Sequence, residues 1–297
     1  MPELPEVETV RRGLEPVLTG ALITRVEQRR KDLRFPFPDR FAQRLEGQTV
    51  AGLTRRSKYL LAHLSGGEVL VIHLGMTGRL SIAHPRNGDA TEVTLGTYVY
   101  DTGSGVKHDH AVMHLADGTI ITYNDPRRFG FMLLLGAEEI ERHALFKSLG
   151  VEPLSEGLTT AYLAGRAHQR KTGMKSFLMD QRHVAGLGNI YVCEALFRAG
   201  VSPLLPASRL AGRRAVPNAR CEVLVPMIRD VLADGIKAGG STLRDYRQTD
   251  GESGRFQKEF RVYGREGQDC VRPGCGGVVR RSVQQGRSTF WCPKCQK

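Results

Sequence analysis

CVRPGC (residues 270–275) and CPKC (residues 292–295) place four cysteines in two pairs near the end of the chain. Sixteen residues separate the two pairs, which is long enough for a β-hairpin. Two thiolate pairs on two turns are a common ligand set for tetrahedral Zn²⁺, and in a reducing compartment such pairs favour metal over disulfides. The spacing therefore predicts a zinc ribbon with one structural Zn²⁺, held by Cys270, Cys275, Cys292 and Cys295.

The segment around these cysteines is strongly basic. Residues 255–297 contain ten Lys or Arg against three Asp or Glu, and the whole chain carries a net charge of +12. More than half of the excess positive charge therefore lies in this short segment. A small basic fold stapled by zinc favours a nucleic-acid partner, whereas a merely solubilising basic surface would not need the metal.

Length and composition indicate a folded protein of about two domains. The chain has 297 residues, of which 40% are hydrophobic and 25% charged, values close to the globular average. The N-terminus has no apolar signal segment, and no apolar run is long enough to cross a bilayer. We therefore expect a cytoplasmic protein with no membrane partner.

Hydrophobic periodicity divides the chain into a β-rich half and a helical half. Residues 5–18 show the spacing of an amphipathic helix. Residues 22–135 contain short apolar runs broken by turns, with hairpins expected around 59–74 and around Asp117-Gly118, which favours an antiparallel sandwich or barrel. The polar stretch 83–107 is an excursion with one expected strand near 97–100.

The second half, after a hinge at 137–150, is expected to be mainly helical. Two helices over 174–179 and 190–199 flank a glycine-containing turn, and Asn189 is the expected N-cap of the second. A further helix over 221–236 contains Pro226, which should kink or interrupt it.

The N-terminus carries a possible nucleophile. Removal of Met1 would leave Pro2 with a secondary α-amine, and an α-amino group has a pKa of about 7.7 to 8.0, so part of it is neutral near physiological pH. Glu3 beside it is a candidate general acid or base. Taken locally, however, Met-Pro is a common start, and the local sequence favours Glu3 as an acid at a helix N-terminus over a catalytic role.

Six motifs resemble, in order and over the full length, those of bacterial formamidopyrimidine-DNA glycosylases. They are PELPE (residues 2–6), RSKYLL (56–61), HLGM (73–76), DPRRFG (125–130), GNIY (188–191) and the C-terminal cysteine ribbon. The resemblance implies an α+β multidomain protein. Its expected parts are a catalytic β-sandwich domain with a flanking helix (1–136), the hinge (137–150), a helix–two-turn–helix DNA-binding domain (151–250), and a lesion-recognition loop with the zinc finger (251–297).

The resemblance implies a bifunctional glycosylase and abasic-site lyase that removes oxidised purines, such as 8-oxoguanine and formamidopyrimidines, from double-stranded DNA. Pro2 would be the Schiff-base nucleophile and Glu3 the acid that assists base departure. Lys58 would serve β-elimination and Arg287 phosphate binding and δ-elimination. The family also suggests a monomer that acts on duplexes containing oxidised bases or abasic sites.

Further residues are implied to bind DNA. An enzyme that acts on a base in a duplex must flip it out and fill the gap, and the resemblance assigns this filling to Met76, Arg127 and Phe129. Backbone contacts are implied for His108, Arg127, Arg170 and Asn189. The segment 250–264 matches the loop that reads the flipped purine.

Three features depart from the family pattern, and two alternative functions stay open. The first cysteine pair has four intervening residues in place of the usual two, the 83–107 excursion is long, and Pro226 lies within an expected helix. An endonuclease VIII-like glycosylase for oxidised pyrimidines would use the same chemistry. A non-catalytic zinc-ribbon DNA-binding protein would explain the charge and the cysteines but would not need a free Pro2.

Overall fold

The structure, a computed structural model, describes residues 2–84, 91–95, 106–241 and 256–297. These residues form two compact units. The first unit contains the described residues up to Lys147 together with 236–241, and the second contains 148–235 and 256–297. No helix among the described residues is long and apolar enough to cross a membrane.

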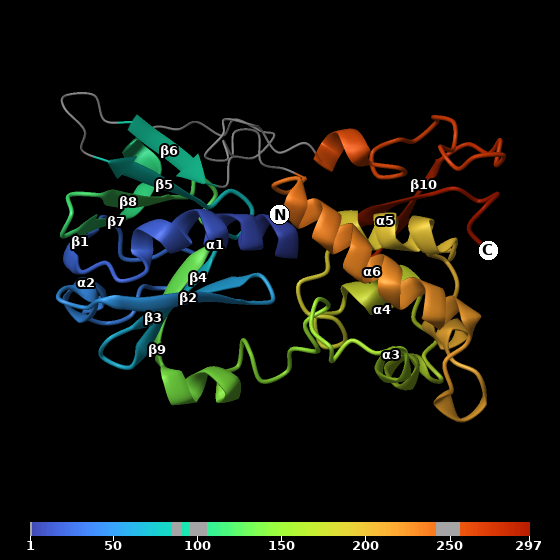
Figure 1. The fold of residues 1–297 in the computed structure, drawn as a ribbon, viewed down its shortest axis with the longest axis horizontal. Coiled ribbons are helices and arrows are strands. Elements are labelled where there is room, and N and C mark those ends of the chain that lie inside the picture. The colour runs from blue at the N-terminus through green and yellow to red at the C-terminus, as the bar shows by residue number, and fades with distance from the viewer. Residues whose placement is uncertain (1, 85–90, 96–105, 242–255) are drawn as a thin grey trace. The chain divides into compact units, whose positions relative to one another are not determined.

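The first unit is built from two antiparallel sheets and a long helix (Figure 1). Its elements are α1 (Leu4–Leu18), β1 (Ile23–Gln28), α2 (Phe41–Leu45), β2 (Val50–Arg56), β3 (Tyr59–Leu64), β4 (Glu68–His73), β5 (Arg79–His84), β6 (Thr91–Leu95), a 3₁₀ turn η1 (Val106–His108), β7 (Asp109–Leu115), β8 (Ile120–Asn124), β9 (Phe131–Gly136) and a 3₁₀ segment η2 (Ala137–Arg142).

The strand order confirms the predicted antiparallel sandwich. One sheet has the order β1-β7-β8-β5-β6 and the other the order β2-β3-β4-β9. Both predicted hairpins are present as β3–β4 and β7–β8. Alternate apolar residues of both sheets meet in one core. The expected strand near 97–100 lies outside the described residues, whereas β6 lies just before it.

Helix α1 forms where the sequence predicts it and packs against β2 and β3. Pro5 lies in its first turn, where a missing N–H costs nothing. Val7, Val10 and Leu14 recur at helical spacing and are almost completely buried in the core. The start of the helix, which carries the candidate catalytic residues, is therefore anchored by its own apolar face.

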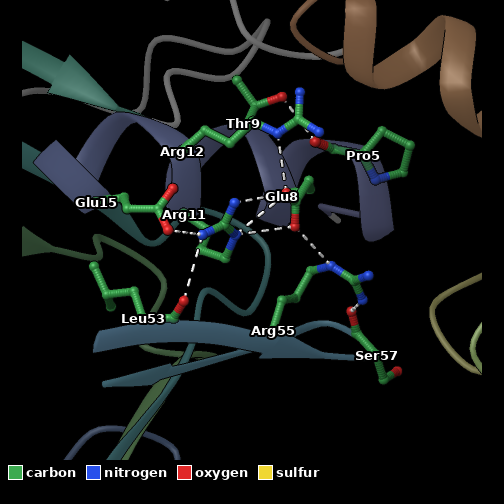
Figure 2. A network of polar contacts seen from close by, with 9 residues as sticks. All are labelled: Pro5, Glu8, Thr9, Arg11, Arg12, Glu15, Leu53, Arg55 and Ser57. Atoms are coloured by element: carbon green, nitrogen blue, oxygen red, sulfur yellow. Dashed lines mark hydrogen bonds and ion pairs between the residues drawn. The ribbon is translucent and has the colours of Figure 1, made fainter. Parts of the chain in front are cut away.

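Polar contacts bind α1 to the turn between β2 and β3 (Figure 2). Glu8 accepts hydrogen bonds from Arg11 and Arg12 on the same helix and from Arg55 of β2 at 3.2 Å. The Arg55 guanidinium also donates to the carbonyl of Ser57 at 2.8 Å. Since Ser57 precedes Lys58, this chain of contacts fixes the turn that bears Lys58 relative to α1.

Helices and a small hairpin make up the second unit (Figure 1). Its elements are α3 (Thr160–Ala167), α4 (Met174–Met179), α5 (Asn189–Ala199), the 3₁₀ turns η3 (Ala207–Leu210) and η4 (Arg213–Ala215), α6 (Ala219–Lys237) up to Gly235, the 3₁₀ turn η5 (Phe256–Glu259), β10 (Arg280–Gln284) and β11 (Arg287–Trp291).

The predicted ribbon hairpin is confirmed. Strands β10 and β11 pair antiparallel, with Gln284 opposite Arg287. The two residues between them, Gln285 and Gly286, both have positive φ, as a tight two-residue hairpin turn requires. This turn places Arg287 at the tip of the hairpin.

Two expectations about the helical half differ from the structure, namely Asn189 as the cap of α5 and an interruption of α6 at Pro226. The N-cap of α5 is Gly188, and Asn189 is the first helical residue. Helix α6 runs through Pro226 without interruption. Pro226 and Glu222, the residue four positions before it, are both exposed, so the missing hydrogen bond lies on the exposed face of α6 while its apolar face stays buried.

A pair of helical glycines tests the packing of the second unit. A Cβ at Gly235 of α6 would lie 2.5 Å from Cε1 of Tyr191, whereas nothing lies within 4 Å of a Cβ at Gly165 of α3. Tyr191 is fully buried and stacks on Phe256 at 5.4 Å. We expect Gly235→Ala to lower the free energy of unfolding by about 1–3 kcal/mol through overpacking. The matched Gly165→Ala should raise it by up to about 1 kcal/mol; urea titration of both variants measures this, and equal effects would contradict it.

The Glu8 contacts predict a pH dependence of stability. Burial alone would raise the pKa of Glu8, but hydrogen bonds from Arg11 and Arg12 and the charge of Arg55 outweigh it and lower this pKa. A lowered native pKa stabilises the fold above the ordinary glutamate pKa of about 4.3, and this contribution is lost as the pH falls through the native value.

Thermal unfolding between about pH 6 and about pH 3 should therefore be less pH-dependent in Glu8→Gln than in the wild type. Glu15→Gln is the control, because the Glu15 side chain is 48% exposed in its ion pair with Arg11 and solvent screens that pair. Parallel pH profiles for the wild type and Glu8→Gln would refute the assignment.

Candidate active site and nucleic-acid interface

The start of α1 is buried and held by a carboxylate. Pro2 and Glu3 are both buried, and Glu6 is only 1% exposed. Glu6 Oε2 accepts the backbone N–H of Glu3 at 2.8 Å, while Oε1 accepts the N–H and the hydroxyl of Ser241 at 2.7 and 2.8 Å. Glu6 thus fixes the residue next to the candidate nucleophile to a segment more than two hundred residues later.

Lys58 lies at the turn between β2 and β3, within the same unit. Ser57 before it adopts a left-handed φ of 54°, so the chain reverses sharply at this point. The Lys58 side chain is largely buried and makes polar interactions. A buried ammonium is held in few orientations, which suits a group that must meet one reacting atom.

Two loops of the first unit present large apolar side chains to solvent. Met76 follows β4 and is 36% exposed, and Phe129 precedes β9 and is 45% exposed. The guanidinium carbon of Arg127 lies 4.8 Å from the centre of the Phe129 ring, a cation–π contact. Exposed apolar side chains beside an arginine are what insertion into a base stack requires.

His108 closes the 3₁₀ turn η1 beside these loops. The backbone carbonyl of His108 accepts the N–H of Asp125 at 3.1 Å, and His108 is partly exposed. His108 is thereby joined through Asp125 to the loop that bears Arg127 and Phe129. The structure therefore joins the segments that carry these predicted DNA contacts, because residues 75–77 and His108 both contact residues 125–130.

A cavity of about 590 Å³ in the second unit, called the cationic cavity below, is lined by five Lys or Arg side chains and one Asp among other residues. Arg170 lines it from the segment between α3 and α4 and Arg287 from β11, together with Arg166 and Arg182. Within the described residues, the side chains of Arg170 and Arg287 form neither an ion pair nor a hydrogen bond. Two unpaired guanidinium groups on one cavity make a site for phosphate oxygens.

The strand that begins at Arg287 is fixed by two helices. Lys175 of α4, only 1% exposed, donates to the carbonyl of Ser288 at 2.9 Å and to the hydroxyl of Thr289 at 2.8 Å. The Asn189 amide donates to the same Ser288 carbonyl at 3.1 Å and to the hydroxyl of Tyr263 at 3.2 Å. Asn189 is therefore joined to the backbone beside Arg287.

A second buried carboxylate holds the chain after the expected recognition loop. Glu194 of α5 is fully buried and accepts the backbone N–H groups of Arg261, Val262 and Tyr263 at 2.9 to 3.1 Å. Of the predicted loop 250–264, residues 250–255 lie outside the described residues. Its described end is anchored to the same helix that carries Asn189.

The four predicted cysteines converge. Their sulfur atoms all lie within 4.8 Å of one another, with 3.8 Å between Cys270 and Cys295 and 3.7 Å between Cys275 and Cys292. A tetrahedron with Zn–S bonds of about 2.3 Å has sulfur atoms about 3.8 Å apart. The geometry therefore fits a four-thiolate metal site.

Neighbouring groups favour a thiolate in this cluster. Burial alone would raise the pKa of Cys292, but the backbone N–H groups of Cys295 and Lys294 and the adjoining thiols lower it to about 7. Backbone donors of this kind stabilise the deprotonated form that binds a metal.

The first cysteine pair and its four intervening residues (270–275, the first knuckle) contact helix α5. Arg272, one of its four intervening residues, donates to the carbonyl of Phe197 at 2.5 Å and to that of Arg198 at 3.3 Å, at the C-terminal end of α5. Its guanidinium also lies over the Phe197 ring at 5.2 Å. Helix C-termini carry unpaired carbonyls and partial negative charge. The knuckle thus docks the ribbon onto α5.

Sequence reasoning missed the residues that hold the site rather than react in it. Glu6, Lys175 and Glu194 lie on apolar helix faces, and Asp125 directly precedes Pro126 in a motif that was noted only for its arginine and phenylalanine. A charged residue on a buried helix face was the available signal, since such a residue must be paired.

Comparison with known proteins agrees with this geometry. Residues 1–132 match the family model of the formamidopyrimidine-DNA glycosylase N-terminal domain, and residues 149–247 match that of the formamidopyrimidine-DNA glycosylase H2TH domain. Formamidopyrimidine-DNA glycosylases of a Bradyrhizobium species and of Cereibacter sphaeroides are each 57% identical over the whole of both chains.

Solved structures show the same fold. The Lactococcus lactis Fpg complex with DNA containing an abasic site is 32% identical, covers 99% of both chains and has a TM-score of 0.82. The MutM (Fpg) protein of Thermus thermophilus is 38% identical, covers 99% of this chain and 98% of its own, and has a TM-score of 0.78. This chain is therefore a member of the formamidopyrimidine-DNA glycosylase family, a family of DNA-binding repair glycosylases.

Proposed function

We propose that this chain is a bifunctional DNA glycosylase and abasic-site lyase that removes oxidised purines from duplex DNA and then cleaves the strand. The observation that carries the proposal is the start of α1, where buried Pro2 and Glu3 precede a helix held by Glu6. A nucleophile must be fixed within a fraction of an ångström of its reacting atom, and this anchoring supplies such a constraint.

The proposed chemistry begins at the α-amine of Pro2 after removal of Met1. The nitrogen forms a bond to C1′ while the bond from C1′ to the base breaks, and the base leaves with that electron pair and a proton. Glu3 is the acid that assists this departure and the opening of the sugar ring. Ring opening breaks the bond from C1′ to O4′, O4′ takes a proton, and an iminium forms on the Pro2 nitrogen. Removal of a proton from C2′ by a base then forms the C2′–C3′ double bond, and the 3′ phosphate leaves with the electron pair of its bond to C3′.

In this proposal Lys58 and Arg287 act in the two elimination steps that cleave the strand. Lys58 serves β-elimination and contacts a phosphate, and the buried turn that holds it supports this role. Arg287 binds a phosphate and serves δ-elimination, which is supported by its place on the cationic cavity, where its guanidinium has no ion pair with any described residue. Both groups are cationic, as stabilisation of a leaving phosphate requires.

Met76, Arg127 and Phe129 are proposed to fill the gap left by the flipped base. Their exposure and the Arg127–Phe129 contact support the assignment. The apolar groups would replace lost stacking, and the guanidinium would hydrogen-bond to the unpaired base.

His108, Arg127, Arg170 and Asn189 are proposed contacts to the DNA backbone. Arg170 lines the cationic cavity, which supports its assignment. The Asn189 amide already donates to Ser288 and Tyr263, so a phosphate contact through this amide requires that one of these bonds be exchanged.

Zn²⁺ is the proposed metal, one ion bound by Cys270, Cys275, Cys292 and Cys295, with a structural role. It would hold the two knuckles and so the base of the hairpin that carries Arg287. The proposed partner is double-stranded DNA that contains oxidised bases or abasic sites, the proposed state is a monomer, and the proposed location is the bacterial cytoplasm.

Borohydride trapping tests the nucleophile. The purified protein is incubated with a duplex containing 8-oxoguanine opposite cytosine, and the covalent adduct is mapped by mass spectrometry. We expect the adduct on Pro2, because reduction fixes the iminium. Glu3→Gln should lose more trapping on 8-oxoguanine than on a preformed abasic site, where no base has to leave.

The other outcomes separate the alternatives. An adduct with an oxidised pyrimidine but none with 8-oxoguanine would indicate an endonuclease VIII-like enzyme. No adduct with any lesion or with an abasic site would leave a non-catalytic zinc-ribbon protein.

Loss of one metal ligand should disturb the hairpin. In Cys292→Ser we expect the zinc content to fall from about one ion per chain to a small fraction, and affinity for lesion DNA to fall about tenfold or more, since folding of the ribbon and binding of the metal are coupled. Cys221→Ser is the matched control, because Cys221 is buried outside the cluster and donates to the Thr160 carbonyl. Elemental analysis and a DNA titration measure both effects; full zinc in Cys292→Ser would reject the assignment.

A further inference from the structure

The two loops that carry Met76, Arg127 and Phe129 share one fully buried carboxyl group. Asp125 has no exposed surface. Its Oδ1 accepts the hydroxyl of Thr77 at 2.5 Å, and its Oδ2 accepts the backbone N–H of Gly130 at 2.8 Å. Asp125 therefore binds the loop after β4 with one oxygen and the far end of its own loop with the other.

Thr77 completes the connection from the other side. Its hydroxyl, which donates to Asp125, also accepts the backbone N–H of Arg127 at 3.2 Å. Thr77 is 7% exposed, so both of these contacts are sheltered from water and cannot easily be replaced by it. Arg127 is thus held at its own backbone through a residue of the neighbouring loop.

The backbones of the loops are in direct contact. Gly75 has a φ of 61°, and a Cβ there would overlap the backbone of Phe129 and Gly130. A left-handed conformation and a close backbone approach both require glycine. Met76 and Phe129 therefore project from two loops that cannot move independently without breaking this contact.

We propose that Asp125 and Thr77 are positioning residues that join the two loops into one rigid wedge. The inference rests on the proposed base-flipping function. Opening a duplex costs a few kcal/mol per unstacked base. The bases therefore tend to stack again and to displace any side chain that fills the gap. Side chains on two separately mobile loops would be displaced from the gap. Loops joined to each other by buried hydrogen bonds keep these side chains in place against the sandwich core.

Thr77→Val against Thr77→Ser is the central test. Valine keeps the volume and removes the hydroxyl, and serine keeps the hydroxyl. We expect Thr77→Val to slow single-turnover excision of 8-oxoguanine from a duplex about ten- to a hundredfold, the scale of a misplaced positioning group. Cleavage of a single-stranded oligonucleotide with an abasic site should fall much less, because no stack has to be opened. Thr77→Ser should restore duplex excision to near the wild-type rate.

Thr119→Val controls for the loss of any buried hydroxyl. Thr119 is fully buried in the same unit and contacts His84 at 3.1 Å, away from both loops. If Thr77→Val unfolds at a lower temperature, the rates are compared with those of Thr119→Val at temperatures where both are folded. Equal losses in the two variants, or equal losses on duplex and single strand in Thr77→Val, would overturn the proposal.

A second readout separates this inference from the proposed function. Fluorescence of 2-aminopurine placed opposite an abasic analogue reports insertion of the wedge without any chemistry. A wild type that inserts but does not excise would refute the proposed activity and leave the wedge testable by Thr77→Val. A Thr77→Val variant that inserts as well as the wild type would refute the wedge while leaving the activity intact.

Discussion

The Glu6 carboxylate joins two segments that lie far apart in the sequence. One oxygen accepts the N–H of Glu3 and the other accepts two donors from Ser241. A buried carboxylate is tolerable only when its oxygens are well paired, so these contacts are maintained together or lost together. The start of α1 is consequently fixed at one point by Glu6 and, two residues later, by the Glu8–Arg55 contact.

The second unit uses the same device to hold its hairpin and the segment 261–263 that precedes it. Glu194 binds three successive backbone N–H groups, and the Lys175 ammonium binds the Ser288 carbonyl and the Thr289 hydroxyl. Each charged group is buried in α4 or α5 and satisfied largely by backbone of a segment distant in sequence. These buried charges therefore hold a loop and a strand in place, while Arg170 and Arg287, which are proposed to touch DNA, are exposed.

Sequence patterns predicted the helices and hairpins well, because residues close together in the sequence determine these elements. The apolar spacing of Val7, Val10 and Leu14 predicted α1, and alternation with turn residues predicted the hairpins. The predictions differed from the structure where the tertiary surroundings of a residue determine where a helix begins or whether it continues. Gly188 is the N-cap of α5 and Asn189 its first residue, and Pro226 lies on the exposed face of α6, where the loss of one backbone hydrogen bond is tolerated.

The sequence by itself determined the class of fold, the four-cysteine ribbon, the basic partner surface and, through its motifs, the family and the residues proposed to react. These depend on residue type and spacing along the chain, which a sequence displays directly. Only the tertiary structure decided which side chains hold the reacting ones. The contacts of Asp125 with Thr77 and of Glu6 with Ser241 join residues 48 and 235 positions apart. Such pairings arise when folding buries a charge and leaves it one arrangement of donors, and no periodicity in a single sequence records that arrangement.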